Sequence, residues 1–524
     1  MTASTGPSPY GNYAYATLTA NALRAPDQIA VTYRGDEQIS YGELNRRVNR
    51  RTHALAAAGV KPGTVVASLL HETLNVTEFY LAEAKLGAVL AAMNPYWPDD
   101  VLVGVVEQAA SPAFLYDAHF DDLVDRIRPR LPDVSLWLRV GGTAEGAADL
   151  DALAAGSPED EPELGAHGDD ALAYFYTSGT TGLPKAVVHT HASSLSVAQL
   201  WLDVPKSADS VFATGPIIWG IGFTAIAGPA LYGGVRLALE NDFGPAHFLS
   251  VAPRERVTHI SVIPSFWSQL FADDRHADVD LSSLQAVLIG GEPLLPSLLQ
   301  RIKDRVPHAR IYSYYGQTEA PYTCFGRLDD GSQQPGSSGR ARTTCAVQVT
   351  DAAGSRVVGE VGEIRLAGPH LLREYAGQPE KTADVLRDGW YVGGDLGILD
   401  EHGILTVLGR REDAILKQGR WTQPSQVEEA AAALDGVAEA GAVGVPEGGD
   451  QQRVLLTVVP RAGHTLDPDQ IAATLRDRLP AESQPDRVLV VDALPHAQDA
   501  SGGQGKLLRR EIRTRWGGEL EPVS

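Results

Sequence analysis

Helical patterns alternate with short β-branched runs along most of this chain, and that alternation limits the folds open to it. Residues 41–60, "YGELNRRVNRRTHALAAAGV", have the spacing of an amphipathic helix, and residues 64–70, "TVVASLL", read as a buried strand. The positions at helical spacing in the first segment are Leu44, Val48, Thr52, Leu55 and Ala56. The same succession recurs downstream, which predicts an α/β protein in which helices pack against parallel sheets.

The length and a change of pattern indicate more than one structural unit. A chain of 524 residues is too long for a single hydrophobic core. Between residues 345 and 408 the pattern changes to strand and turn, which predicts a β-rich subdomain. After Gly409 a compact α/β segment begins, with helices predicted near residues 425–434 and 468–479. We therefore predict two domains, residues 1–409 and residues 410–524.

The charge balance excludes some classes of partner. The chain has 44 Lys and Arg against 66 Asp and Glu, a net charge of -22, which disfavours nonspecific binding to nucleic acids or anionic membranes. An anionic ligand must therefore be held by a local site. No stretch approaches the roughly 20 uncharged apolar residues of a membrane span, and Cys324 and Cys345 are the only cysteines. With no secretory signal at the N-terminus, we expect a soluble, cytoplasmic protein without a membrane partner.

One short stretch combines hydroxyls, glycines and a single lysine. In "YFYTSGTTGLPKAVVHTH", residues 174–191, small residues follow a predicted strand and Lys185 adds a positive charge. The small residues are Thr177, Ser178, Gly179, Thr180, Thr181 and Gly182. Such a turn brings backbone N–H groups and hydroxyls to one point, which suits a polyphosphate. It is not the common phosphate loop, because two residues separate Gly182 from Lys185, and a solvated turn is the alternative interpretation of the stretch alone.

This string resembles the signature phosphate loop of the adenylate-forming superfamily, which includes acyl- and aryl-CoA synthetases, adenylation domains of peptide synthetases, and luciferases. Four further segments resemble motifs of that family and occur in its order. They are "GGEPL" at 290–294, "YYGQTEA" at 314–320, "DGWYVGGDLGILDEHGILTVLGRRED" at 388–413 and "GGQGKLLRREIR" at 502–513. Together the five segments span most of the chain.

The resemblance implies a role for each matched residue. It places adenine against the backbone of Gly291, Glu292 and Pro293 and against the ring of Tyr315, which Gly316 follows. It implies that Thr318 contacts phosphate and that Glu319 helps to hold Mg²⁺. It places Asp395 and Arg410 on the ribose hydroxyls, Glu412 at the hinge between domains, and Lys506 as the lysine of adenylation. Thr177 and Lys185, with residues 178–182, would cradle the phosphates of ATP.

The resemblance also implies a fold and a reaction. The fold is a large N-terminal domain of two α/β sheets plus a β-rich subdomain, with a small mobile C-terminal α/β lid. In the reaction, a carboxylate attacks the α-phosphorus of ATP, and a thiol such as that of CoA then accepts the acyl group. Because an anion approaches a polyanion, catalysis needs positive charge and oriented donors rather than a strong base.

The pocket for the acid is predicted from residues 214–228, "TGPIIWGIGFTAIAG", where the resemblance puts Trp219 in place of a usual histidine. The other predicted pocket residues are Ile217, Phe223, Gly290, Tyr314 and Tyr322. A compact apolar pocket suits a small or aromatic acid, although core packing explains these residues equally well. His189 and His191 lack companions at ligand spacing, which favours supporting or helix-start roles over metal binding.

Some residues depart from the family pattern and keep alternatives open. Trp421 lies in the segment that lines the pantetheine channel of CoA ligases, and Gly393 replaces a usual threonine before Gly394 and Asp395. The leading hypothesis is an ATP-dependent ligase that passes a small or aromatic carboxylic acid to CoA or a carrier protein. The alternatives are adenylation of another acid such as nitrite with transfer to an amine, which forms a diazo compound, and a catalytically degenerate nucleotide-binding paralogue.

Overall fold

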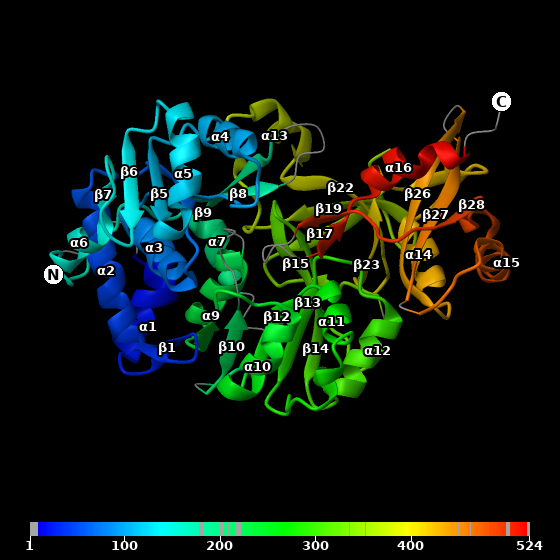
Figure 1. Cartoon of the computed structure of the whole chain (residues 1–524), viewed down its shortest axis with the longest axis horizontal. Helices are drawn as coiled ribbons and strands as arrows, with labels where there is room; N and C mark the ends of the chain where they lie inside the picture. The colour runs from blue at the N-terminus through cyan, green and yellow to red at the C-terminus, as the bar shows by residue number, and fades with distance from the viewer. Residues whose placement is uncertain are drawn as a thin grey trace.

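The structure is a computed structural model of the whole chain. It describes residues 9–177, 183–199, 204–207, 209–214, 222–334, 336–351, 353–448, 451–461, 463–498 and 504–520. In Figure 1 the chain runs from the blue N-terminal part at the left, through green and yellow, to the orange and red C-terminal part at the right. Within the described ranges, no helix has the length and apolar character needed to cross a bilayer.

The first α/β sheet is parallel in its centre and antiparallel at both edges. Parallel pairing joins β1 to β11, β11 to β10, β10 to β12, β12 to β13, and β13 to β14. In sheet order, its strands are β16 (Arg340–Ala341), β15 (Ala320–Arg327), β14 (Arg310–Gln317), β13 (Ala286–Gly290), β12 (His259–Val262), β10 (Val211–Thr214), β11 (Arg236–Leu239), β1 (Ile29–Tyr33) and β2 (Glu37–Ser40). We call it the green sheet, because β10 to β15 are drawn in green in Figure 1, although β1 is drawn in blue.

The second α/β sheet is also parallel in its centre, but it is antiparallel at one edge only, because β6 and β7 at the other edge pair in parallel. Its central strands β8, β4, β3, β5 and β6 pair in parallel, and β9 pairs with β8 in an antiparallel hairpin. In sheet order, its strands are β20 (Glu374–Tyr375), β9 (Lys185–Thr190), β8 (Ala171–Thr177), β4 (Val89–Ala92), β3 (Val65–Leu69), β5 (Ala113–Asp117), β6 (Leu136–Val140) and β7 (Ala148–Asp149). The predicted strand at 64–70 is therefore confirmed as β3.

Helices connect and cover these parallel strands. They include α1 (Ala20–Arg24), α2 (Tyr41–Ala57), α3 (Thr73–Leu86), α4 (Asp99–Gln108), α5 (Asp121–Ile127), α6 (Leu150–Ala155), α7 (His191–Ala198), α9 (Gly228–Tyr232), α10 (Pro245–Glu255), α11 (Pro264–Leu270) and α12 (Pro296–Arg305). The predicted helix at 41–60 is α2, whose start is capped by the Ser40 hydroxyl accepting from Glu43 N. Its residues Leu44, Val48, Thr52 and Leu55 are buried as predicted. Ala56 is exposed, so that part of the prediction is wrong; Ala56 and Ala57 lie at the end of α2, where that face of the helix is left uncovered.

A third, antiparallel sheet forms the predicted β-rich subdomain. Its strands are β18 (Arg356–Val357), β17 (Ala346–Thr350), β19 (Val361–Ala367), β22 (Trp390–Leu399), β21 (Leu386–Arg387) and β23 (Leu405–Arg410), with α13 (Pro379–Val385) inserted before β21. β22 pairs with both β19 and β23. This pairing brings Asp395 of β22 opposite Arg410 of β23.

The C-terminal part has hydrophobic clusters of its own, built from residues between Ile415 and Leu520. Its elements are β24 (Ile415–Lys417), β25 (Arg420–Thr422), α14 (Pro424–Ala432), β26 (Val437–Gly448), β27 (Gln451–Pro460), α15 (Pro468–Arg478), β28 (Arg487–Val490), β29 (His496–Gln498), β30 (Gln504–Leu507) and α16 (Arg509–Trp516). Both helices predicted in this part are confirmed, as α14 and α15. The predicted fold class, two α/β sheets with a β-rich subdomain and a small α/β part, is confirmed; the boundary at 409/410 and the mobility of the lid stay predictions.

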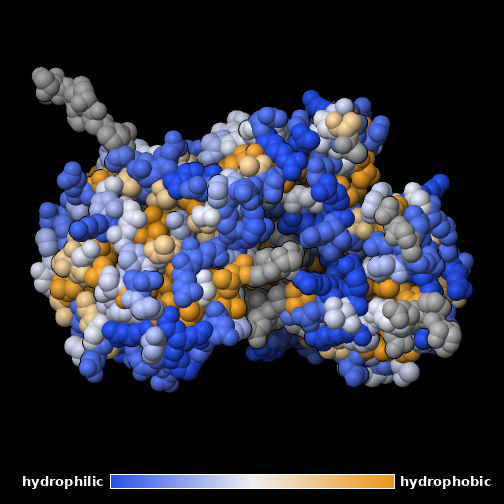
Figure 2. Space-filling view, turned by 90° about the horizontal axis from the view of Figure 1, so that it is seen from above, coloured by the Kyte–Doolittle hydropathy of each residue, from blue (hydrophilic) through white to orange (hydrophobic). Residues whose placement is uncertain are grey.

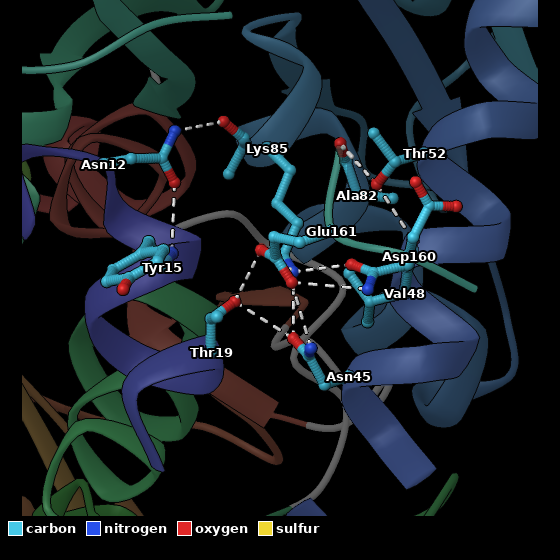
Figure 3. Close-up of polar contacts among 12 residues, drawn as sticks. Asn12, Tyr15, Thr19, Asn45, Val48, Thr52, Ala82, Lys85, Asp160 and Glu161 are labelled. Carbon is cyan, nitrogen blue, oxygen red and sulfur yellow. Dashed lines mark hydrogen bonds and ion pairs between the residues drawn. The ribbon is translucent and has the colours of Figure 1, made fainter. Parts of the chain in front are cut away.

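A buried lysine fastens an irregular segment onto this framework. Lys85 of α3 is fully buried, and its Nζ donates to Asn45 Oδ1 at 2.8 Å, Asn49 Oδ1 at 2.7 Å and Glu161 Oε1 at 2.6 Å. Glu161 also accepts from the Thr19 hydroxyl at 2.9 Å, so one carboxylate joins three segments (Figure 3). We call these five residues the Lys85 network. It holds the segment between α6 and β8 against α2, α3 and Thr19, the residue that precedes α1.

Candidate active site

The sequence motifs gather where the parallel strands of the green sheet end. Gly290 is the last residue of β13, and Gln317 is the last residue of β14. The turn from β14 to β15 carries Thr318 and Glu319. In open α/β sheets, ligands bind in the crevice outside the carboxyl ends of the strands. Seen from above, the surface is hollowed between the left-hand and right-hand parts of the molecule (Figure 2).

Three donors converge on the carboxylate of Asp395. The Tyr315 hydroxyl donates to Oδ2 at 2.7 Å, Gln317 Nε2 donates to the same oxygen at 2.5 Å, and Arg410 Nε lies 2.9 Å from Oδ1. The Tyr391 hydroxyl donates to Gln317 Oε1 at 2.6 Å, which fixes the orientation of that amide. We call these five residues the Asp395 cluster. It joins the end of β14 to β22 and β23, so the predicted ribose ligands Asp395 and Arg410 lie together, beside the predicted adenine-stacking Tyr315.

The protonation states in the Asp395 cluster follow from burial and charge. Burial and the neighbouring Asp395 carboxylate raise the pKa of Tyr315 well above its ordinary value, so its hydroxyl remains a donor. Burial alone would lower the pKa of Arg410, but Asp395 and the other groups around the guanidinium together outweigh that effect, and the pKa is raised. Arg410 also donates from Nη1 to the Gly393 carbonyl at 2.6 Å. Arg410 is therefore charged at neutral pH.

Glu319 is linked to the phosphate-loop lysine through a tyrosine. Glu319 is buried, and its Oε1 accepts from the Tyr375 hydroxyl at 2.7 Å. Lys185 Nζ lies 5.1 Å from the centre of the same tyrosine ring, within the range of a cation–π contact. Lys185 opens β9 directly opposite Thr177, which ends β8. The structure thus brings Thr177, Lys185 and Glu319 to one place, while Ser178, Gly179, Thr180, Thr181 and Gly182 lie outside the described residues.

His189 supports the turn that carries Thr318. Burial lowers the pKa of His189 to about 4, so the ring is neutral at pH 7. Its Nε2 lies 2.8 Å from the Thr318 carbonyl, and its Nδ1 lies 3.1 Å from Ser193 Oγ. His191 is the first residue of α7. The supporting and helix-start roles predicted for the two histidines are confirmed.

Close backbone contacts explain the glycines of two motifs. A Cβ on Gly316 would lie 2.4 Å from the backbone nitrogen of Tyr322, and a Cβ on Gly290 would lie 2.4 Å from the Tyr314 ring. Gly291 has a φ of 84°, which favours glycine. Glu292 accepts from the backbone nitrogen of Ser265 at 3.0 Å, at the start of α11. Pro293 follows it, so the predicted adenine segment leaves the end of β13 as a fixed turn.

Two of the tyrosines predicted to line the acid pocket lie against each other. The ring centres of Tyr314 and Tyr322 lie 4.4 Å apart, and Tyr322 is held at a left-handed φ of 50° in an otherwise extended strand. Backbone strain of this kind clusters at active sites and ligand-binding sites. Phe223 is 1% exposed and packs on Tyr80, with ring centres 4.8 Å apart, so core packing accounts for its apolar character. Ile217 and Trp219 lie outside the described residues.

The structure places the remaining predictions in the C-terminal part. The backbone of Lys506 lies in β30, which pairs with β29, and its side chain is outside the described part of the chain. Glu412 is exposed in the turn between β23 and β24. Trp421 of β25 is 59% exposed. The roles predicted for these three residues stay predictions.

Comparisons with known proteins identify the family. Residues 18–376 match the family described as AMP-binding enzyme, and residues 426–502 match its C-terminal domain. This chain belongs to the AMP-binding enzyme family. The predicted membership of the adenylate-forming superfamily, and of its enzymes related to acyl- and aryl-CoA ligases, is confirmed.

Several AMP-binding enzymes resemble the chain over its whole length. A feruloyl-CoA synthase from Amycolatopsis sp is 31% identical over 501 residues, which cover 95% of this chain and 97% of that protein. The structure of ATP-bound MatB from Rhodopseudomonas palustris has a TM-score of 0.88 at 26% identity and covers 98% of this chain and 100% of that one. The amide bond synthetase McbA from Marinactinospora thermotolerans has a TM-score of 0.85 at 26% identity, with 97% and 99% coverage.

Sequence reasoning missed three members of this AMP-binding enzyme's site. Gln317 and Tyr391 orient Asp395, and Tyr375 holds Glu319. Gln317 occupies the variable position of its motif, and Tyr391 stands inside the motif that carries Asp395, so their positions were available as weak signals. Tyr375 stands in no motif that we matched. Only the pairing of β20 with β9 brings it to the site.

The donor set around Glu319 fits a magnesium ion that is bound mainly by phosphates. No cluster of three or more His, Cys, Asp or Glu suited to a metal occurs among the described residues. Mg²⁺ usually takes one or two carboxylates and completes its shell with water and substrate phosphates. Only Oε1 of Glu319 is engaged, by Tyr375, among the contacts of the described residues. Its second oxygen is therefore suited to such an ion.

Proposed function

We propose that this enzyme adenylates a small or aromatic carboxylic acid with ATP and transfers the acyl group to a thiol, either CoA or a carrier protein. The Asp395 cluster carries the proposal, because it presents a charged arginine and an oriented carboxylate at the edge of the green sheet where nucleotides bind in such folds. The ATP-bound structure of MatB and the name of feruloyl-CoA synthase, which specifies an aromatic acyl group, support it.

We assign the nucleotide to the matched residues as follows. Asp395 and Arg410 bind the ribose, and Tyr315 with the turn from Gly290 to Pro293 binds adenine. Thr177, Lys185 and the loop at 178–182 bind the phosphates, assisted by Thr318. Glu319 holds Mg²⁺, which when bound neutralises negative charge on the phosphates. Residues 410–524 form a lid that turns at Glu412 and delivers Lys506.

In the first step the catalytic residues stabilise negative charge and do not transfer a proton. A carboxylate oxygen of the acid forms a bond to the α-phosphorus, the bond to pyrophosphate breaks, and acyl-AMP results. Lys506 and Lys185 stabilise the negative charge that spreads over the phosphates in the transition state. In the second step the acceptor attacks the acyl carbon, loses its proton, and AMP leaves.

The test of this assignment is ATP/pyrophosphate exchange across fatty, aryl and amino acids plus nitrite. We expect exchange with a small or aromatic acid, and thioester formation when CoA is added. If none of these acids supports exchange, the result would favour the degenerate paralogue and contradict the proposal.

Loss of Lys506 tests the adenylation step itself. We expect Lys506→Ala to lower the exchange rate roughly 100- to 1000-fold, the scale for losing one preorganised charged donor. Lys381→Ala, at an exposed lysine of α13, is the matched control and should leave the rate unchanged. A fall of less than threefold in Lys506→Ala, with unchanged folding, would remove that residue from the mechanism.

A second candidate function has its own support. The McbA structure is that of an amide bond synthetase, so an amine acceptor occurs among similar folds. Exposed Trp421 lies in the segment matched to the thiol channel, where a bulky side chain disfavours pantetheine. Product analysis with amines in place of CoA distinguishes the two candidates, and exchange with nitrite alone would favour the diazo-forming alternative.

A further inference from the structure

A cavity of about 910 Å³ lies at the edge of the green sheet opposite to the candidate active site. Many of its residues precede or begin parallel strands of the green sheet, such as β10, β11, β13 and β14 (Figure 1). They include Ser210, Arg236, Arg256, Gln285, His308 and Arg310. We call it the basal cavity. Its volume is within the range of sites for small molecules, but its lining is polar and rich in arginine, which is unusual for a site that binds an apolar ligand.

The basal cavity is distinct from the candidate active site, although β13 reaches both. Ala286, the first residue of β13, lines the cavity, and Gly290, the last, belongs to the candidate active site. Four residue steps along a strand span about 13 Å. A ligand in one site therefore does not occupy the other.

One of the three arginines is already neutralised. Arg236 Nη1 lies 3.1 Å from Glu255 Oε2 and donates to the Thr32 hydroxyl at 2.8 Å, and its Nη2 donates to the Glu255 carbonyl at 2.9 Å. Glu255 also pairs with Arg254 at 3.0 Å. Arg236 and Glu255 therefore satisfy each other within the cavity wall.

The other two arginines form no ion pair with the cavity lining, although the charge of Arg256 also attracts the carboxylate of Asp280, which lies outside the lining. Arg256 and Arg310 are exposed, and neither guanidinium has a hydrogen bond or ion pair within the described ranges. Asp209 is the other acidic residue of the lining. Within the lining itself, the guanidinium groups of Arg256 and Arg310 outnumber the one carboxylate that has no arginine partner, that of Asp209. In a chain with a net charge of -22, such a local excess of positive charge favours an anion.

The chemistry of the lining narrows the ligand class. A guanidinium presents its N–H donors in a planar fork that matches phosphate and carboxylate oxygens. Ser282 and Gln285 add neutral polar groups to the same cavity. We propose that the basal cavity binds a small polyanion carrying phosphate or carboxylate groups, held by Arg256 and Arg310. This site is independent of the proposed adenylation reaction.

Titration calorimetry with tripolyphosphate and with citrate tests the proposal on the full chain. We expect one of these probes to bind, and we expect the double variant R256A/R310A to weaken its binding at least tenfold. The control R356A/R487A removes two exposed arginines of β18 and β28, so it matches the change in net charge. It should stay within twofold of the wild type. Both double variants keep the active-site cleft, so probe binding there is the same in each. The difference in probe affinity between R256A/R310A and R356A/R487A therefore reports binding in the basal cavity.

The outcomes separate the ligand classes and the proposal from its alternatives. Tighter binding of tripolyphosphate assigns a phosphate ligand, and tighter binding of citrate assigns a carboxylate ligand. Equal weakening by both double variants would mean nonspecific attraction, and binding of neither probe would mean that the arginines only offset the carbonyl ends of α10 and α12. Either result would overturn the proposal. If R256A/R310A is unstable, R256K/R310K keeps the charge and should still weaken binding, because it loses the planar fork.

Discussion

The Lys85 network and the Asp395 cluster each pair a cation with a carboxylate. In the Lys85 network the cation is the buried member, whereas in the Asp395 cluster the carboxylate is. In the first pair the lysine side chain is 0% exposed and Glu161 is 33% exposed. In the second pair the aspartate is 9% exposed and Arg410 is 36% exposed. The buried member of each pair has three hydrogen-bonding partners, so neither is left with an unsatisfied charge.

The difference lies in the bonding capacity that remains. Lysine has three N–H donors, and Lys85 uses all of them inside the protein. Arginine has five, and among the described residues Arg410 uses its Nε on Asp395 and an Nη1 donor on Gly393. The Lys85 network is therefore complete without a ligand, whereas the Asp395 cluster has donors left for one. We expect substitutions in the first to change stability and substitutions in the second to change activity.

The largest effect is expected from Lys85→Met. It leaves Glu161 and two asparagines without their shared donor, and breaking a buried ion pair costs about 3–5 kcal/mol of unfolding free energy. The exchange rate of the molecules that remain folded should be unchanged. The measurements are urea unfolding and exchange rate per folded molecule.

Lys61→Met is the matched control, at an exposed lysine in a turn, and should stay within about 0.5 kcal/mol of the wild type. An equal loss of unfolding free energy in Lys85→Met and Lys61→Met would show that the buried contacts of Lys85 do not contribute to stability.

The next effect is expected from Asp395→Ala. Removal of the carboxylate frees Arg410 and leaves Tyr315 and Gln317 unoriented, so the exchange rate should fall roughly 100- to 1000-fold, as for loss of a preorganised charged contact. The loss of stability should be smaller than in Lys85→Met, because Arg410 regains water at its exposed side.

Asp121→Asn serves as the control, since Asp121 pairs with Arg139 at 2.6 Å, outside the Asp395 cluster. If Asp395→Ala keeps a normal exchange rate but loses much of its stability, the Asp395 cluster is structural, and the expected difference between it and the Lys85 network is contradicted.

A smaller loss of stability is expected from Glu161→Gln. The amide keeps the shape but removes the charge that faces Lys85, so unfolding should become easier by about 1–3 kcal/mol at pH 7. Chemical denaturation gives the value. Glu163→Gln, two residues away at an exposed glutamate, should change it by no more than about 0.5 kcal/mol.

The last prediction concerns how the contribution of Lys85 to the free energy of unfolding changes with pH. Burial lowers the pKa of Lys85 to about 8, and the attraction of Glu161 offsets this only in part. The unfolded chain, with an ordinary lysine pKa, binds more protons between about pH 8 and 10.5, so this group's contribution to stability rises with pH, by at most about 1.4 kcal/mol per unit. The stability difference between the wild type and Lys85→Met should therefore widen from pH 8 to pH 10. A constant difference would mean that the pKa of Lys85 is not lowered.

The local elements of this protein were predictable because their signals are local. The helical spacing of α2 and the apolar run of β3 each lie within one segment, and the structure confirms both. The motifs around Glu319, Asp395 and Arg410 were equally visible, since each is a short run of residues with a fixed spacing. Ala56 was placed wrongly because helical spacing does not show how far along the helix the protein covers that face.

The sequence by itself determined the α/β class, the β-rich subdomain and the family, because periodicity and motif spacing are properties of neighbouring residues. Only the tertiary structure decided that Tyr375 holds Glu319, 56 residues away, that Lys85 meets Glu161 across 76 residues, and that Arg256 and Arg310 share a cavity. Such contacts depend on which strands become neighbours in a sheet. That choice is made by packing over the whole chain, and no short stretch of sequence records it.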